Sequence, residues 1–147
     1  MDKELTNSSD IIGMFCRLNM NSKHNLPIRP SEMGILIYTQ KQTNSVTPLM
    51  ISQFFGITKP SVSTIIKALI KLGYLEKHKS TDDKRSYSIT ITNKGQKLVE
   101  TTYDEYFRTI EILKEKMGHD NFTQFIKLVN TANNILEANK DKKEENR

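Results

Sequence analysis

The residues best suited to binding a partner lie in a short polar stretch, Ser80–Thr90, which reads STDDKRSYSIT. Asp82, Asp83, Lys84 and Arg85 place four charges on a turn, and the residues after it alternate between polar and apolar. An arginine at the tip of such a ribbon can enter the minor groove of duplex DNA, where the potential is most negative. We therefore expect Arg85, with Lys84 beside it, to contact DNA.

Asp83 stands two residues before Arg85 and is expected to brace the turn. It can do so by accepting a hydrogen bond from the backbone, or by pairing with Arg85 or another nearby base. A tip without a partner could also carry these residues for solubility alone, and the turn by itself does not separate the two interpretations.

Positive charge is concentrated around this turn. Between Gly56 and Leu98 there are nine basic and three acidic side chains, a local charge of +6, which leaves −1 for the rest of a chain whose net charge is +5. A concentrated basic surface favours a polyanion, because neutralising phosphates releases counterions. A solvated basic face would have the same composition.

The segment from Thr58 to Gly73 predicts a helix that has one polar and one apolar face. Thr58 can cap it, Pro60 lies in its first turn, and Gly73 suits a left-handed end. The polar face holds small hydroxyls first and lysines later, which suits a helix lying in the major groove. The polar face consists of Pro60, Ser63, Thr64, Lys67 and Lys71, whereas Val62, Ile65, Ile66, Leu69 and Leu72 are expected to face the core.

The neighbouring elements predict a helix-turn-helix followed by a β-hairpin. Thr47 and Pro48 can start a short helix that ends at Gly56, and the turn to Thr58 is short enough for a helix-turn-helix. Residues 74–80 and 86–92 alternate as strands do. Helical spacing predicts further helices over about 5–20, from about 31, from Thr92 to about Met117, and from about Asp120. The expected fold is mainly α with a small β-wing.

The run ISQFFGITKPSVSTIIKALIKLGYLEKHKSTDDKRSYSITITNKG resembles the winged helix-turn-helix core of the MarR family of bacterial transcriptional regulators. The resemblance lies in the GYL turn, in the D-x-R wing of Asp83 and Arg85, and in the hydrophobic-Thr-x-x-Gly junction of Ile91, Thr92 and Gly95. It implies that Arg85 reaches the minor groove while Asp83 braces the wing. It also implies that Ser61, Ser63, Thr64 and Lys67 line the major groove, with Lys59 near a phosphate.

We expect a homodimer. The first helix and the last two carry apolar stripes that one chain has little other surface to cover. A two-fold dimer presents two recognition helices to a pseudo-palindromic operator, and the resemblance implies intertwined terminal helices. We thus predict one MarR-like domain over residues 1–147, with a winged helix-turn-helix core at about 31–95, dimerisation helices at about 5–30 and 96–137, and a frayed tail at 138–147. A monomer whose fifth helix folds back on its own core is the alternative.

Proteins resembling this family often respond to small phenolic ligands, metals or thiol oxidation. Cys16 lies in the first helix, where some peroxide-sensing relatives carry a reactive cysteine, but no tyrosine flanks it and Arg17 is its only adjacent cation. A lone cysteine in an amphipathic helix is otherwise a small buried hydrophobe. His24 and Arg29 could line a pocket for an anionic effector, or could be ordinary loop residues.

Several classes of protein are disfavoured by the composition. One cysteine and three scattered histidines supply no metal motif, and no cofactor is expected. No paired carboxylates, Gly-rich phosphate loop or nucleophile arrangement suggests an enzyme. The absence of a long apolar run and the polar N-terminus predict a cytoplasmic protein rather than a membrane protein. The main hypothesis is a sequence-specific repressor, and the alternative is a winged-helix module that binds protein, or binds nucleic acid non-specifically. No motif in the sequence identifies the target genes or the effector, or distinguishes a repressor from an activator.

Overall fold

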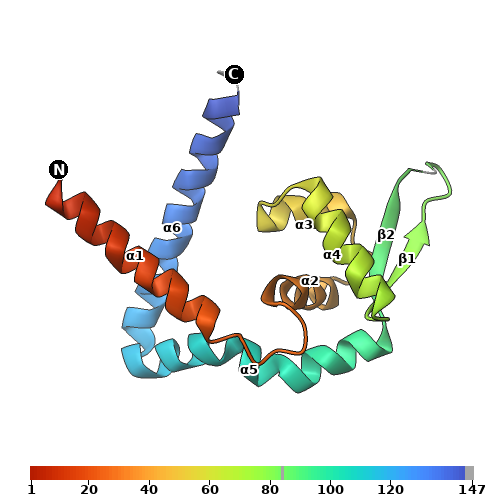
Figure 1. The fold of residues 1–147 in the computed structure, drawn as a ribbon, viewed down its shortest axis with the longest axis horizontal. Helices are drawn as coiled ribbons and strands as arrows, with labels where there is room; N and C mark the ends of the chain where they lie inside the picture. Colours follow the sequence, from red (N-terminus) through yellow and green to blue (C-terminus); the bar gives the residue numbers. More distant parts are fainter. Residues whose placement is uncertain (84, 145–147) are drawn as a thin grey trace. The chain divides into compact units, whose positions relative to one another are not determined.

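The computed structural model describes residues 1–83 and 85–144, with only the backbone described for residues 141–144. These residues form six helices and two strands (Figure 1). Their order is α1 (Lys3–Asn21), α2 (Pro30–Lys41), α3 (Pro48–Phe55), α4 (Lys59–Lys71), β1 (Leu75–Lys79), β2 (Tyr87–Ile91), α5 (Asn93–Met117) and α6 (His119–Glu144). The predicted class, mainly α with a small β-wing, is confirmed.

The chain divides into two compact units, Met1–Tyr106 and Phe107–Arg147, whose boundary falls within α5. The first unit contains α1, α2, the helix-turn-helix of α3 and α4, the hairpin and the start of α5. The second contains the end of α5 and α6. The assignment of residues 5–30 and 96–137 to dimerisation stays a prediction.

Local sequence signals set the limits of α3 and α4. Thr47 caps α3 through its hydroxyl, which accepts from the Met50 N–H at 3.2 Å. The helix ends at Gly56, which has the left-handed φ of 63° that glycine adopts without steric cost. Thr58 then caps α4 by accepting from the Ser61 N–H. The predicted caps and the turn between the two helices are therefore confirmed.

The core of the first unit is built around α2, whose residues 32–37 are all buried. Apolar side chains from the Val46 loop, α3, α4 and β2 pack with those of α2. Nine side chains in this core are less than 2% exposed: Met33, Ile35, Leu36, Val46, Ile51, Val62, Ile66, Leu69 and Ile89. Burying a side chain of this size is worth about 1.5–3 kcal/mol relative to leaving it exposed. This core holds α4 with its polar face outward.

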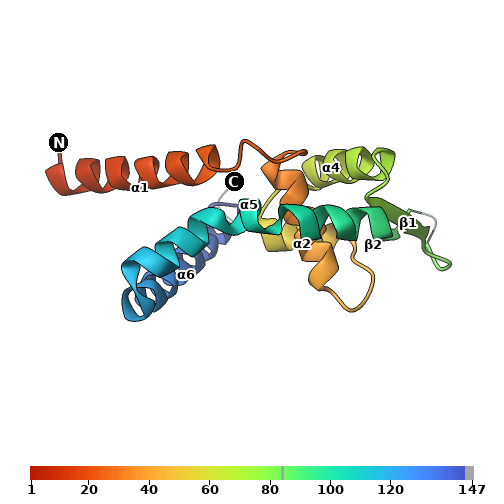
Figure 2. The ribbon, with the colours of Figure 1, turned by 90° about the horizontal axis from the view of Figure 1, so that it is seen from below.

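The hairpin lies beside α4 and turns back antiparallel (Figure 2). Leu75 pairs with Ile91 and Lys79 with Tyr87, and the Ser80 N–H adds a bond to the Ser86 carbonyl at 3.2 Å where the tip begins. Val46 adds a short bridge to β2, exchanging two backbone hydrogen bonds of 2.9 and 2.7 Å with Ile89. This bridge was not predicted from the sequence.

The junction between β2 and α5 explains the hydrophobic-Thr-x-x-Gly motif physically. The Thr92 hydroxyl donates to the Gly73 carbonyl at 2.6 Å and accepts from the Gly95 N–H at 3.1 Å. A Cβ on Gly95 would overlap the Tyr74 carbonyl oxygen and lie 2.7 Å from Ile91 Cγ1. Only glycine therefore allows the start of α5 to approach the turn that ends α4.

One prediction about a side chain was wrong. Leu72, expected to face the core, is 45% exposed, because it caps the end of α4 where the chain turns away at Gly73. The tail from residue 138 is helical as far as Glu144, residues 145–147 lie outside the described part of the chain, and fraying stays a prediction. Its lysines and glutamates have good helix propensity, and the Asn139 side chain adds a 2.8 Å bond to the Ile135 carbonyl.

Candidate nucleic-acid interface

The leading half of α4 presents its hydroxyl and ammonium groups away from the core. Val62, Ile66 and Leu69 are at most 1% exposed and fix the rotation of the helix. The opposite face therefore carries the predicted contact residues: Lys59, Ser61, Thr64 and Lys67 are exposed, and Ser63 is half-buried.

Two hydroxyls on this face already make local bonds. Thr64 Oγ1 donates to the Pro60 carbonyl at 3.0 Å, so its remaining capacity is that of an acceptor. The Ser61 hydroxyl accepts from Thr58 Oγ1 at 2.9 Å and keeps its own proton available for donation. Neighbouring positions thus offer a donor and an acceptor.

The tip of the hairpin is held by backbone bonds centred on Asp83. Its carboxylate accepts the Arg85 N–H at 2.9 Å, and its carbonyl accepts the Ser86 N–H at 3.2 Å. Of the two ways in which Asp83 could brace the turn, the structure thus shows the backbone bond. Arg85 itself is exposed. Lys84, predicted as a further DNA contact, lies outside the described residues.

The strands behind the tip are tied together across the ribbon. Lys77 Nζ lies 4.2 Å from the centre of the Tyr87 ring, a cation–π contact. On the other face, a ring nitrogen of His78 lies 2.7 Å from the Thr90 hydroxyl oxygen. These cross-strand contacts help to stabilise the hairpin, because a two-stranded ribbon has little stability of its own.

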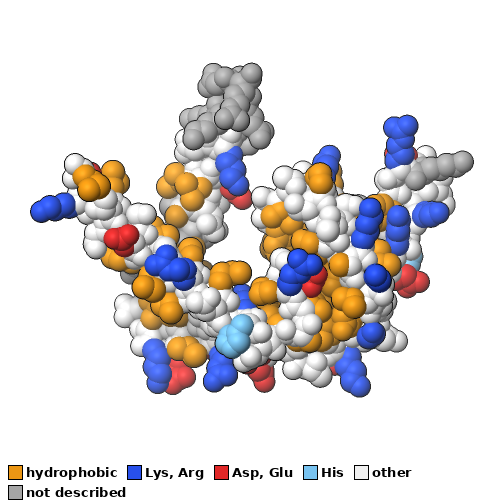
Figure 3. Space-filling view, in the orientation of Figure 1, with side chains coloured by type: hydrophobic (Ala, Val, Ile, Leu, Met, Phe, Trp, Pro, Cys, Tyr) orange, Lys and Arg blue, Asp and Glu red, His pale blue; other side chains and the backbone are white. Residues whose placement is uncertain are grey.

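A concavity of about 480 Å³ joins α4 to the hairpin. Three of the predicted contact residues, Lys59, Ser63 and Arg85, line it together. The other lining residues come from the start of α3 and from the tip end of β2: Thr47, Pro48, Leu49, Ser86 and Tyr87. Lys and Arg side chains gather over α4 and the hairpin in the space-filling view (Figure 3).

The other residues predicted to contact DNA or to brace the wing do not line this concavity. Ser61, Thr64 and Lys67 share the exposed face of α4 but do not line the concavity, and Asp83 acts on the hairpin backbone. Sequence reasoning missed the contribution of Thr47, Pro48 and Leu49. Their only signal was helix-start chemistry, which does not show that α3 begins beside α4 and the wing.

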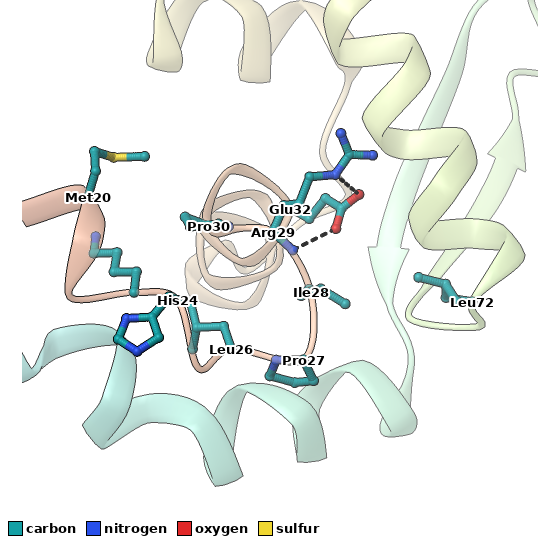
Figure 4. Close-up of a pocket in the computed structure, with 10 residues that line it drawn as sticks. Met20, His24, Leu26, Pro27, Ile28, Arg29, Pro30, Glu32 and Leu72 are labelled. Atoms are coloured by element: carbon teal, nitrogen blue, oxygen red, sulfur yellow. Dashed lines mark hydrogen bonds and ion pairs between the residues drawn. The ribbon is translucent and has the colours of Figure 1, made fainter. Parts of the chain in front are cut away.

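His24 and Arg29 both line a second cavity of about 560 Å³, beside the loop between α1 and α2 (Figure 4). Arg29 is already engaged there: its side chain pairs with Glu32 at 3.3 Å, and its backbone N–H donates to the same carboxylate at 2.9 Å. A ring nitrogen of His24 contacts the Asn21 carbonyl. The apolar part of the lining comes from Met20, Leu26, Pro27, Ile28, Pro30 and Leu72.

Lys23 is a third basic residue in this cavity, and sequence reasoning missed it. Its ammonium lies 4.2 Å from the centre of the Tyr106 ring. Burial lowers the pKa of Lys23 below its ordinary value and raises the pKa of the Tyr106 hydroxyl. Both side chains are half-buried, and this burial is the cause of the two shifts.

The remaining candidate, Cys16, is exposed in the single chain rather than buried. Among the described side chains, no group of three His, Cys, Asp or Glu residues could hold a metal ion. Within the same residues, no helix has the length and apolar character needed to cross a bilayer.

Two helices that meet at Gly56, followed by a hairpin against the second of them, define a winged helix-turn-helix protein. Residues 26–86, about two fifths of the chain, match the model of the MarR family, and this match confirms the resemblance seen in the sequence. Members of this family are transcriptional regulators rather than enzymes.

A curated protein and two solved structures illustrate the similarity. The HTH-type transcriptional repressor YetL of Bacillus subtilis (strain 168) is 21% identical over 107 residues, which are 73% of this chain and 64% of YetL. A MarR/EmrR family transcriptional regulator from Acinetobacter sp. ADP1 is 22% identical with a TM-score of 0.77, covering 94% of this chain and 99% of that one. MepR of S. aureus, solved in a DNA-binding conformation, is 19% identical with a TM-score of 0.78, covering 88% and 98%. The two structural matches support the fold.

Proposed function

We propose that this chain is a homodimeric, sequence-specific DNA-binding transcriptional regulator that represses by occupying a pseudo-palindromic operator. The observation that carries the proposal is the shared concavity, in which Lys59 and Ser63 of α4 meet Arg85 of the wing. When a helix reads base edges in one groove and a ribbon reaches the next groove, the DNA backbone between the two grooves must fit into a concavity between helix and ribbon.

In this arrangement α4 enters the major groove with its leading end. Ser61 and Thr64 offer a donor and an acceptor to base edges, and Lys67 meets a phosphate. Arg85 enters the minor groove, and Lys59 lies against the intervening backbone. The local charge of +6 supports this orientation, because the remainder of the chain sums to −1.

The homodimer is supported by apolar residues that remain exposed in the single chain. On α1, Leu5, Ile11, Ile12 and Leu18 are each more than 60% exposed. On α6, Leu128, Ile135 and Leu136 are each more than 55% exposed. Stripes of this length on helices mark protein–protein contact, and a second copy of the chain is the simplest partner.

We further propose that the cavity beside the α1–α2 loop takes a small anionic organic effector. Lys23 and Arg29 supply its positive charge, His24 adds a polar ring, and Met20, Leu26 and Ile28 form an apolar wall for the rest of such a molecule. The pairing of Arg29 with Glu32 leaves Lys23 as the principal cation without a carboxylate partner among the described contacts.

The test of the main proposal is to select fragments of the source genome bound by the purified protein and to determine the site. A dimer predicts a pseudo-palindrome with half-sites about one helical turn apart, or a multiple of it. Equilibrium sedimentation of the free protein tests the homodimer directly. Affinity that falls with salt but does not distinguish the selected duplex from random duplex would support the alternative, a non-specific module.

A further inference from the structure

The end of the recognition helix is held by a residue that no sequence motif singled out. Lys94, in the first turn of α5, donates from its ammonium to the Leu72 carbonyl at 2.7 Å. The last carbonyls of a helix have no intrahelical donor, and a cation there also complements the helix dipole. Lys94 thus satisfies a group at the end of α4 from 22 residues further along the chain.

The rest of the Lys94 side chain also follows this turn. Its ammonium lies 4.9 Å from the centre of the Tyr74 ring. A Cβ built on Gly73 would lie 3.7 Å from Lys94 Cδ, so the lysine stem runs alongside that glycine. Thr92 binds the next carbonyl, that of Gly73, at 2.6 Å. Two side chains at the start of α5 therefore hold two successive carbonyls at the end of α4.

We propose that Lys94 is a positioning residue for DNA recognition: by anchoring the Leu72 carbonyl, it fixes the axis of α4 relative to α5 and thereby the seat of the helix in the major groove. This inference rests on the proposed function. Leu72 lies 13 residues beyond Lys59, or roughly 20 Å along a helix. A small tilt at the anchored end therefore displaces the leading residues that would read the bases.

The competing role for a basic side chain in this region is direct contact with a phosphate, and the two roles have different signatures. Losing a phosphate contact weakens binding to every duplex and lowers the dependence of affinity on salt by about one counterion. Losing a positioning contact weakens binding to the correct site while the salt dependence and the affinity for random duplex stay unchanged.

The experiment measures affinity for the genome-selected duplex and for random duplex of equal length over a range of salt concentrations. Lys94→Met keeps most of the stem and removes the ammonium. Lys94→Arg restores a donor. Lys97→Met is the matched control, because it removes the same charge one turn along α5, from an exposed side chain. Thermal melting establishes that each variant is folded.

We expect Lys94→Met to lower affinity for the selected duplex about threefold to tenfold, in line with the loss of one charged hydrogen bond. The salt dependence and the affinity for random duplex should match those of the unmodified protein and of Lys97→Met, and Lys94→Arg should recover most of the loss. Unchanged discrimination in Lys94→Met, or parallel losses on both duplexes with a reduced salt dependence, would overturn the proposal.

Amide hydrogen exchange tests the anchor without DNA. The Gly73 and Tyr74 N–H groups donate to the Ile70 and Leu69 carbonyls, each at 2.9 Å. Their exchange should accelerate in Lys94→Met, while that of Ile66 in the middle of the same helix should not. Unchanged exchange at the turn would rule out the anchor. If the unmodified protein fails to discriminate between duplexes, the proposed function fails, and exchange still decides whether Lys94 holds α4.

Discussion

The carboxylate of Asp83 accepts a hydrogen bond from the backbone N–H of Arg85 at 2.9 Å. The acid therefore shapes the turn of the wing through the peptide group rather than through the guanidinium. Because the bond needs only an acceptor at this position, its geometric role can be separated from its charge.

Replacing Asp83 by alanine removes both the acceptor and one negative charge. We expect weaker operator binding, because the tip loses its internal bond, although charge alone predicts stronger binding to DNA. Asp83→Asn should retain most of the affinity, since an amide oxygen also accepts. Asp82→Ala removes the same charge from the neighbouring position but leaves the bond between Asp83 and the Arg85 N–H in place, so it should not weaken binding. Electrophoretic mobility shifts at fixed salt measure all three, and an increase for Asp83→Ala would contradict the bracing role.

Arg85→Ala should weaken specific binding by about 1–3 kcal/mol, the range for a groove contact, without altering the melting temperature. The side chain is exposed and its N–H bond to Asp83 is made by the backbone, so folding does not depend on it. Arg85→Lys keeps the charge and shows how much of the effect is specific to the guanidinium. Operator affinity equal to that of the unmodified protein would remove Arg85 from the interface.

Gly95→Ala should destabilise the fold by about 1–3 kcal/mol, since the new methyl group meets the Tyr74 carbonyl and Ile91 Cγ1. Gly13→Ala is a suitable control, because its Cβ would meet only the flexible Arg17 side chain at 3.3 Å. Alanine at that helical position should be neutral or slightly stabilising. Urea unfolding followed by circular dichroism distinguishes the two. If Gly95→Ala is as stable as Gly13→Ala, the junction between β2 and α5 accommodates the methyl group without a loss of stability.

Cys16→Ser should leave operator binding unchanged in reducing buffer, because the cysteine is exposed on α1, away from the concavity. The same variant tests oxidant sensing. If peroxide releases the unmodified protein from its operator and not Cys16→Ser, the cysteine is a sensor. A peroxide-insensitive unmodified protein would end that hypothesis.

Tyr106 should be the last tyrosine to ionise in an alkaline titration, since burial raises the pKa of its hydroxyl above the ordinary 10.0. The folded state then holds this proton at pH values where the unfolded chain has lost it. This group therefore makes stability fall as the pH rises from 10.0 through the folded pKa. Tyrosinate absorbance measures the effect, and Tyr106→Phe should lack the latest component. A titration curve that loses an early component instead would contradict it.

The sequence predicted most of what is local in this fold. Two threonines cap helices and two glycines end them in the left-handed conformation, as their residue types predict: Thr47 and Thr58, and Gly56 and Gly73. The burial of Val62, Ile66 and Leu69 followed from helical spacing. The prediction failed for Leu72 because periodicity assumes that a helix continues, whereas here the helix ends.

What the sequence did not show depends on contacts between distant segments. The bond of Lys94 to the Leu72 carbonyl follows from the close approach of two helix ends, which Gly95 permits and no spacing encodes. The share of Thr47 and Leu49 in the concavity likewise depends on where α3 begins in space. Lys23 gave no signal, because a single lysine after a helix is common on any protein surface.

Leu72 has a double position: its side chain lines the cavity beside the α1–α2 loop, while its carbonyl is the one that Lys94 binds. A small molecule bound in that cavity would contact the residue that caps the C-terminal end of α4, the helix proposed to read DNA. Effector binding and DNA binding would then be coupled through a single residue, because a displacement of Leu72 would move the end of α4.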